Sequence, residues 1–174
     1  MAETLVEAPL EGYERAVGSA LWRLEDARHR TLQLLTDVPP EVVDRRAGGL
    51  NTIGTVLYHM ALIEADWLYS EILERPVPAA IERLLPADHR DAAGILTTIK
   101  GETLEQHLAR LGAVRETLLH ELRGMTALEL HRARSLPAYD VSPAWVLHHL
   151  AQHDAEHRAE LGAMIARLRG DVEG

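Results

Sequence analysis

Four segments of the sequence carry apolar residues at alternating three- and four-residue spacings, and this pattern restricts the fold more than any other feature. Such spacing places the apolar side chains on one face of an α-helix. The four predicted helices span about residues 11–36, 51–74, 103–123 and 142–169. The sequence has no sustained alternation of the kind that strands show. The predicted fold is therefore all-α, a four-helix bundle with a long connection between the second and third helices.

Local sequence signals mark the ends of these helices. Asn51 or Thr52 supplies an N-cap for the second helix, and Ser142 followed by Pro143 is a start signal for the fourth. Gly124 stands where a C-terminal cap of the third helix belongs. Residues 126–129 form a capping box, which predicts one short turn.

The long connection runs from about residue 75 to residue 101 and is the least regular part of the chain. Connections of this length inside a compact domain usually carry function or a small helix of their own. We predict that small helix over residues 91–99 and a single short turn over residues 41–46.

The composition narrows the class of protein. The chain length predicts one domain over residues 1–174, and the absence of cysteine rules out disulfides, thiolate metal ligands and a cysteine nucleophile. A net charge of −9 argues against nucleic-acid binding. No run approaches the roughly 18 apolar residues that a membrane span needs, and the N-terminal stretch lacks the pattern of a secretory signal. We therefore expect a cytoplasmic protein with a small-molecule substrate.

The chain has ten histidines, and two of them interrupt the apolar face of the fourth helix. His153 and His157 stand where leucine would be expected, and one helical turn brings them within about 6 Å of each other. Two stacked imidazoles in a core are unfavourable unless a partner satisfies them. A divalent metal would do so, because neutral imidazole nitrogens are good ligands. The positions of this stripe are Val146, Leu150, His153, His157, Leu161, Met164 and Leu168.

The second helix carries a candidate third ligand. His59 borders the apolar stripe and can match the level of His153 if the two helices pack side by side. Three histidine ligands would leave at least one coordination position for water or substrate. His149, one turn before His153, could be a ligand, a hydrogen-bonding residue behind the ligands or a residue at the rim.

The remaining histidines lack paired spacing, and we expect His148 at the surface. At least four of the other five are expected to be solvated or to act as simple caps: His29, His89, His107, His120 and His131. The tryptophans are expected in the core or in a pocket wall: Trp22, Trp67 and Trp145.

The histidine pattern has other interpretations. A lone buried histidine is usually a satisfied core residue, so the pair could belong to a polar core network. The stretch from His153 to His157 approaches the H-E-x-x-H motif of zinc proteases, but Asp154 replaces the glutamate that acts as the base. A ferritin-like two-metal site needs inward glutamates that the predicted stripes lack.

His59, the stretch from there to Trp67, and the motif A-W-V-L-H-H-L-x-x-H-x-x-x-H-R over residues 144–158 resemble the DinB/YfiT-like superfamily. The resemblance covers nearly the whole chain and implies that His59, His153 and His157 are metal ligands. The family pattern often has glycine and glutamine shortly after the last ligand. Here Ala159 and Glu160 depart from that pattern, which puts in doubt any role for a glutamine near the site.

The resemblance also implies a function. Some members of the superfamily are metal-dependent transferases or isomerases that use low-molecular-weight thiols such as bacillithiol or mycothiol. We therefore expect one divalent transition metal, with zinc or nickel ahead of iron or manganese, in a thiol transferase. The alternatives are a hydrolase that uses metal-bound water and a non-catalytic, stress-linked metal- or ligand-binding protein. Asp154 and Glu156 are expected to support or flank the site, and a homodimer is expected from family habit.

Overall fold

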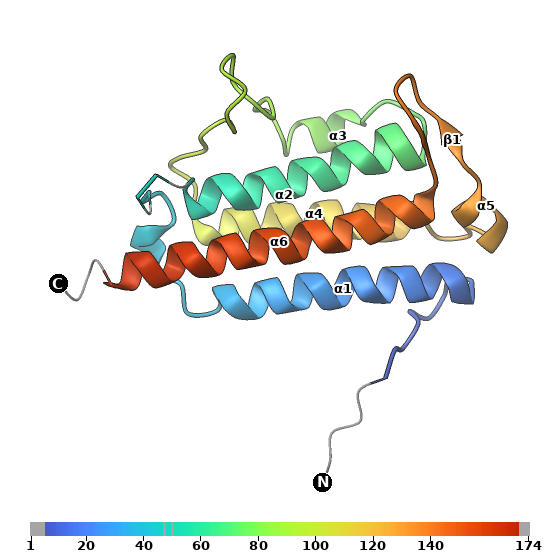
Figure 1. Ribbon diagram of the computed structural model, residues 1–174, viewed down its shortest axis with the longest axis horizontal. Helices are drawn as coiled ribbons and strands as arrows, with labels where there is room; N and C mark the ends of the chain where they lie inside the picture. The colour runs from blue at the N-terminus through green and yellow to red at the C-terminus, as the bar shows by residue number, and fades with distance from the viewer. Residues whose placement is uncertain (1–5, 47, 50, 171–174) are drawn as a thin grey trace, which may run out of the picture.

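The computed structural model describes residues 6–46, 48–49 and 51–170. Four long helices make up most of it, as Figure 1 shows: α1 (Arg15–Leu35), α2 (Ile53–Trp67), α4 (Leu104–Glu121) and α6 (Pro143–Gly170). Helix α6 packs against both α1 and α2, and α2 packs against α4. The predicted all-α fold and the order of its four long helices are confirmed.

Side-chain caps begin α2, α4 and α6, and those of α2 and α6 lie where the sequence predicts them. The Thr52 side chain accepts a hydrogen bond from the Thr55 amide at the start of α2. Thr103 and Gln106 form a capping box at the start of α4. Pro143 is the first residue of α6, and the Ser142 hydroxyl accepts a hydrogen bond from the Trp145 amide. Each cap satisfies an amide that the helix itself leaves without a partner.

Short elements connect the long helices. The capping box at Thr126 opens α5 (Ala127–His131), and the strands β1 (Arg134–Ser135) and β2 (Asp140–Val141) form a small antiparallel pair before α6. The short turn predicted over 41–46 is a 3₁₀ turn, η1 (Pro40–Val42). Helix α2 continues into one turn of π-helix, η2 (Leu68–Ile72).

The small helix in the long connection is not where the sequence predicted it. Helix α3 spans Ala79–Glu82, directly after Pro78, whereas residues 91–99 fold into a tight turn. The Asp91 carboxylate accepts from the amides of Ala93 and Ile95, and Gly94 adopts a φ of +77°. The predicted helix over residues 91–99 is therefore wrong. The physical reason is that hydrogen bonds from an Asp side chain to nearby amides compete with helix formation.

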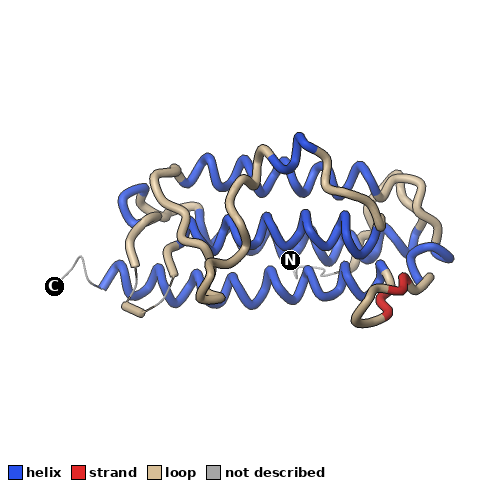
Figure 2. The backbone as a smooth tube through the Cα atoms, turned by 90° about the horizontal axis from the view of Figure 1, so that it is seen from above, coloured by secondary structure: helices blue, strands red, loops and turns tan. Residues whose placement is uncertain are grey.

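Helix α2 is the most enclosed of the four long helices, because the long connection covers the side that α4 and α6 leave open. Figure 2 shows the loop segments crossing this side of the bundle. The Tyr58 hydroxyl bonds both backbone groups of Ala87, and the Thr55 hydroxyl accepts from the Ile99 amide. The connection is therefore anchored directly above the middle of α2.

None of the helices in the described part of the chain combines the length and the apolar character needed to cross a membrane.

Candidate metal centre

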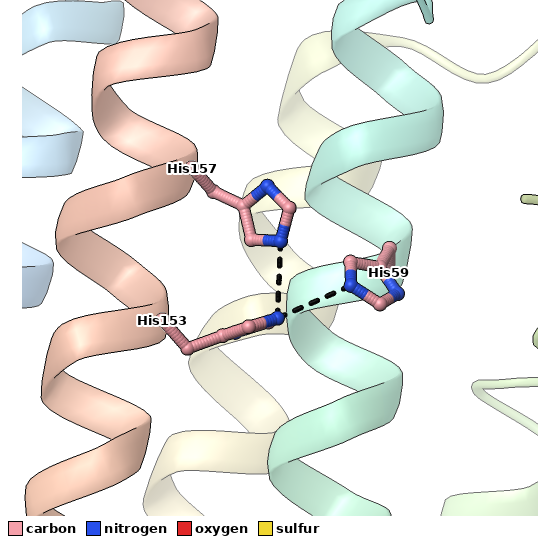
Figure 3. Close-up of side chains that lie close together, drawn as sticks. All are labelled: His59, His153 and His157. Carbon is pink, nitrogen blue, oxygen red and sulfur yellow. Dashed lines mark hydrogen bonds between the residues drawn. The ribbon is translucent and has the colours of Figure 1, made fainter.

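Three histidines from two helices converge in the middle of the bundle. His59 projects from α2, while His153 and His157 project from α6, where a spacing of four residues places them on one face (Figure 3). The Nε2 atom of His153 lies 3.1 Å from Nε2 of His59 and 3.0 Å from Nε2 of His157. One nitrogen from each of the three rings lies within 4.8 Å of the other two. The structure thus brings together the three histidines predicted as ligands.

The surroundings keep the rings of His59 and His153 neutral. Burial, together with the charge that His157 would carry, lowers the pKa of His59 to about 3. The pKa of His153 is also lowered to about 3, first by burial and then by the charges that His157 and His59 would carry. A neutral imidazole has a proton on one nitrogen and a lone pair on the other, so converging nitrogens repel unless a proton or a cation lies between them. Three imidazole nitrogens are a donor set that zinc, nickel, copper and iron accept, so the cluster could hold a metal ion.

A carboxylate behind the cluster orients one ring. The Nδ1–H group of His157 can donate to Oε2 of Glu160 at 2.9 Å, which leaves the lone pair of Nε2 facing the other histidines. Asn51, at the start of α2, reaches the other oxygen of Glu160 at 3.5 Å. The sequence interpretation treated Glu160 only as a departure from the family pattern and missed this role. Its spacing of three residues from His157 was the available signal.

The long connection contributes a fourth histidine beside the cluster. The ring of His89 stacks on that of His59, with a centroid distance of 4.9 Å and an interplanar angle of 10°. Nδ1 of His59 and Nε2 of His89 are buried and have no hydrogen-bond partner among the residues that the structure describes. His89 therefore covers the side of His59 that faces the connection.

His107, on α4, is the second histidine whose burial was not expected. It is completely buried, and its Nδ1 accepts from Arg110 at 3.1 Å. Its Nε2 would lie only 2.7 Å from a Cβ at position 54, so the glycine there allows the close approach. His29, His120 and His131 are exposed. Because His89 and His107 are not, the expectation that at least four of these five histidines are solvated or caps is wrong.

The two histidines that precede the pair on α6 have different surroundings. His148 is exposed, as predicted. His149 lies outside the three-histidine cluster and stacks on Trp67 and Trp145, at centroid distances of 4.5 and 5.0 Å. Of the roles left open for His149, its position among these rings fits a residue at the rim of the site.

Asp154 is neither a supporting group nor a rim residue of the histidine cluster, which corrects the sequence interpretation. It is 2% exposed and takes part in what we call the ionic cluster, whose members come one from each long helix: Arg28, Glu64, Arg115 and Asp154. Glu156, expected beside the site, is exposed to solvent.

The ionic cluster satisfies its own charges. Glu64 accepts from Arg28 at 2.7 Å and from Nε of Arg115 at 2.7 Å, and Arg28 also donates to Asp154 at 3.1 Å. Although burial alone would raise it, Arg115 and Arg28 lower the pKa of Glu64. Burial outweighs the same two arginines at Asp154 and raises its pKa. Two guanidinium groups and two buried carboxylates thus form a network of ion pairs beside the histidines, and Arg115 extends it to Glu25 at 2.6 Å.

The fold and the site together define a helical bundle with a three-histidine centre. The sequence model of the DinB superfamily matches residues 23–161, a span that contains His59, His153 and His157. The chain therefore belongs to the DinB superfamily. A search of curated proteins finds no match to this chain.

Proposed function

We propose that this protein binds one divalent transition metal through His59, His153 and His157, with zinc and nickel as the leading candidates. We propose further that it catalyses thiol transfer at that centre. The observation that carries the proposal is the convergence of one nitrogen from each of three imidazoles, at 3.0 and 3.1 Å, where burial keeps the rings of His59 and His153 neutral. A centre with three protein ligands keeps at least one position open for a reactant, unlike the closed four-ligand sites that serve structure.

The residues around the centre prepare it for this use. Glu160 fixes the tautomer of His157, and the low pKa of His59 and His153 keeps their lone pairs free at neutral pH. A divalent metal bound here would retain its charge and lower the pKa of a thiol or of water that reached it. His89 limits access from the side of the long connection.

The absence of cysteine defines the reaction that we propose. The protein cannot supply a thiol, so the sulfur arrives on a low-molecular-weight thiol such as bacillithiol. The thiolate sulfur forms a bond to an electrophilic carbon of the second substrate. The thiol proton passes to solvent, and the leaving group departs with its electron pair. Water in place of the thiol would make the same centre a hydrolase, which is the alternative that an assay must separate.

The test begins with the metal content of the purified protein. We expect about one zinc or nickel per chain, as for a mononuclear centre, and a loss of most of it in His153→Ala. The matched control is His148→Ala, which removes an exposed histidine from the same helix and should keep the metal. Wild-type protein without bound metal, or full metal content in His153→Ala, would contradict the proposed centre.

The second stage measures turnover of an electrophile such as 1-chloro-2,4-dinitrobenzene, with zinc, nickel or manganese and with or without bacillithiol or cysteine. We expect consumption of thiol that depends on metal and is lost in His153→Ala. Turnover that needs no thiol would support the hydrolase, and an intact metal centre without turnover would support a binding protein.

A further inference from the structure

Beyond the three histidines, the seam between α2 and α6 continues as a stack of aromatic rings. Trp67, at the end of α2, and Trp145 and His149, near the start of α6, form what we call the aromatic platform. Their rings are nearly parallel, with interplanar angles of 5° to 16° and centroid distances of 4.5 to 5.8 Å. A parallel stack of this kind presents a broad π surface at its free side.

Trp145, one ring of the platform, lines a cavity of about 550 Å³ at the end of the bundle where the small strand pair lies. Trp145 and Tyr139 both line this cavity, and each is 48% exposed. The size is that of a small-molecule site rather than of a packing defect. Half-exposed aromatic rings on a cavity wall are available to a guest without any rearrangement of the core.

The charges around the cavity are negative. Asp140 lines it, and behind Tyr139 lies Glu71, which is 5% exposed and accepts from the Tyr139 hydroxyl at 2.6 Å. The other oxygen of Glu71 is buried without a hydrogen-bond partner among the described residues, so its charge is not fully compensated inside the protein.

Of the basic groups near this end, Arg132 is exposed to solvent between two residues that line the cavity, and Arg134 is engaged elsewhere. Arg134, on β1, is bound to the backbone oxygens of Ile72, Glu129 and Arg132 and lies beside Glu74, at 3.5 Å. His131 is the one imidazole on the cavity wall, and it is exposed to solvent. The combination of aromatic faces and carboxylates disfavours an anion and attracts a positively charged group.

We propose that this cavity binds an organic cation, with an ammonium group held against Trp145 and Tyr139 and attracted by Glu71 and Asp140. Cations bind over the faces of tryptophan and tyrosine because the ring quadrupole is negative there. Tryptophan binds cations more strongly than tyrosine does. The ring of Trp145 is held in place by stacking on Trp67 and His149.

The platform also sets the length of a substrate that uses both sites. Trp145, His149, His153 and His157 follow one another at four-residue steps along α6, so Trp145 lies about 12 Å along the helix axis from His153. On this point the inference rests on the proposed function: the electrophile would be an elongated molecule with a cationic group at one end and its reactive carbon at the other. The binding of the cation itself does not need the metal.

The test compares choline with 3,3-dimethylbutan-1-ol, which has the same shape but carbon in place of the charged nitrogen. Binding is followed by tryptophan fluorescence and calorimetry, on protein treated with chelator and on protein loaded with zinc. We expect choline to bind about tenfold more tightly than the neutral alcohol, whether or not zinc is present.

Two variants locate the effect. Trp145→Leu should abolish the preference for choline, and Glu71→Gln, which keeps an acceptor for Tyr139, should weaken choline severalfold and leave the alcohol unchanged. Trp22→Phe, on α1, is the control and should behave like the wild type.

Equal binding of the two probes, no saturable binding of choline, or an unchanged preference in Trp145→Leu would overturn the inference. These outcomes are independent of the metal centre. Choline binding in a protein that takes up no metal would support the cation site and contradict the proposed function. Metal-dependent thiol turnover without choline binding would support the proposed function and contradict the cation site.

Discussion

The bundle core contains two neighbouring polar clusters, and they differ in whether their members can satisfy one another. Asp154 of the ionic cluster directly follows His153 of the histidine cluster on α6. In the ionic cluster opposite charges meet at 2.7 to 3.1 Å, so each group stabilises the next. In the histidine cluster identical groups meet at similar distances and none can neutralise the others. The first cluster therefore satisfies its own charges, while the second leaves Nδ1 of His59 buried without a partner among the described residues.

The largest effect is expected from breaking the ionic cluster. Glu64→Leu would leave buried Arg28 with Asp154 as its carboxylate partner, and Arg115 with Asp154 and the more exposed Glu25. Removing one partner of a buried ion pair typically costs about 3–5 kcal/mol, so we expect a loss of this size in the free energy of unfolding, measured by urea denaturation. Glu156→Leu, at an exposed position on α6, is the control and should change stability by less than about 0.5 kcal/mol. A loss for Glu64→Leu no larger than the control would show that the ion pairs do not hold the bundle.

The histidine cluster should respond in the opposite sense. In metal-free protein, the double variant His153→Leu with His157→Leu should unfold at equal or higher urea concentration, because leucine replaces polar rings on the apolar face of α6. Zinc at about 100 times its dissociation constant should stabilise the wild type by about 2.7 kcal/mol and the double variant not at all. Equal responses to zinc would mean that these histidines form only a polar core network.

Glu160 offers a smaller and more specific change. Glu160→Ala removes the acceptor for Nδ1–H of His157, and loss of such a partner typically lowers metal affinity by about 10- to 100-fold. Glu160→Gln keeps an acceptor oxygen and should therefore lose less metal affinity than Glu160→Ala. Competition with a chelating dye measures both affinities. If Glu160→Ala binds as tightly as the wild type, the carboxylate does not orient the ring.

The pH dependence of stability should separate the two clusters without any mutation. The pKa of His59 and of His153 is about 3 in the fold against an ordinary value of 6.5, so between these pH values the unfolded chain binds more protons than the folded one. Metal-free protein should therefore lose stability as the pH falls below about 6.5. The full shifts correspond to about 2 kcal/mol for each histidine by pH 5, and solvent screening of these half-buried rings makes the loss smaller. Glu64 contributes at lower pH. Because its pKa is lowered in the fold, its contribution to stability is lost only as the pH falls below 4.5, the ordinary pKa of a glutamate.

Urea titrations at several pH values measure this profile. The double leucine variant should lose the contribution of His153 to the part between pH 6.5 and pH 5, keep that of His59, and keep the acid loss below it. A profile in the double variant identical to that of the wild type would show that the histidines do not titrate as their burial implies.

Much of the fold could be predicted because its signals are local. Thr52, Thr103 and Ser142 cap helices through bonds to their own next turn, and the apolar stripes repeat within a few residues. The prediction failed at residues 91–99, where the Asp91 side chain and Gly94 make a turn in place of a helix. The ionic cluster was missed although its signal was present: Arg28 and Arg115 stand within apolar stripes, four residues after Leu24 and Leu111.

The sequence by itself determined the four helices and the pairing of His153 with His157, because residues four apart share a helix face wherever the helix lies. Only the tertiary structure decided that His59 joins them while His149 stacks on tryptophans, and that His89 closes one side. It also decided that four charges, one from each long helix, meet in the core. Contacts between helices depend on how their side chains pack and on the level at which they cross, and no spacing within one helix contains that information.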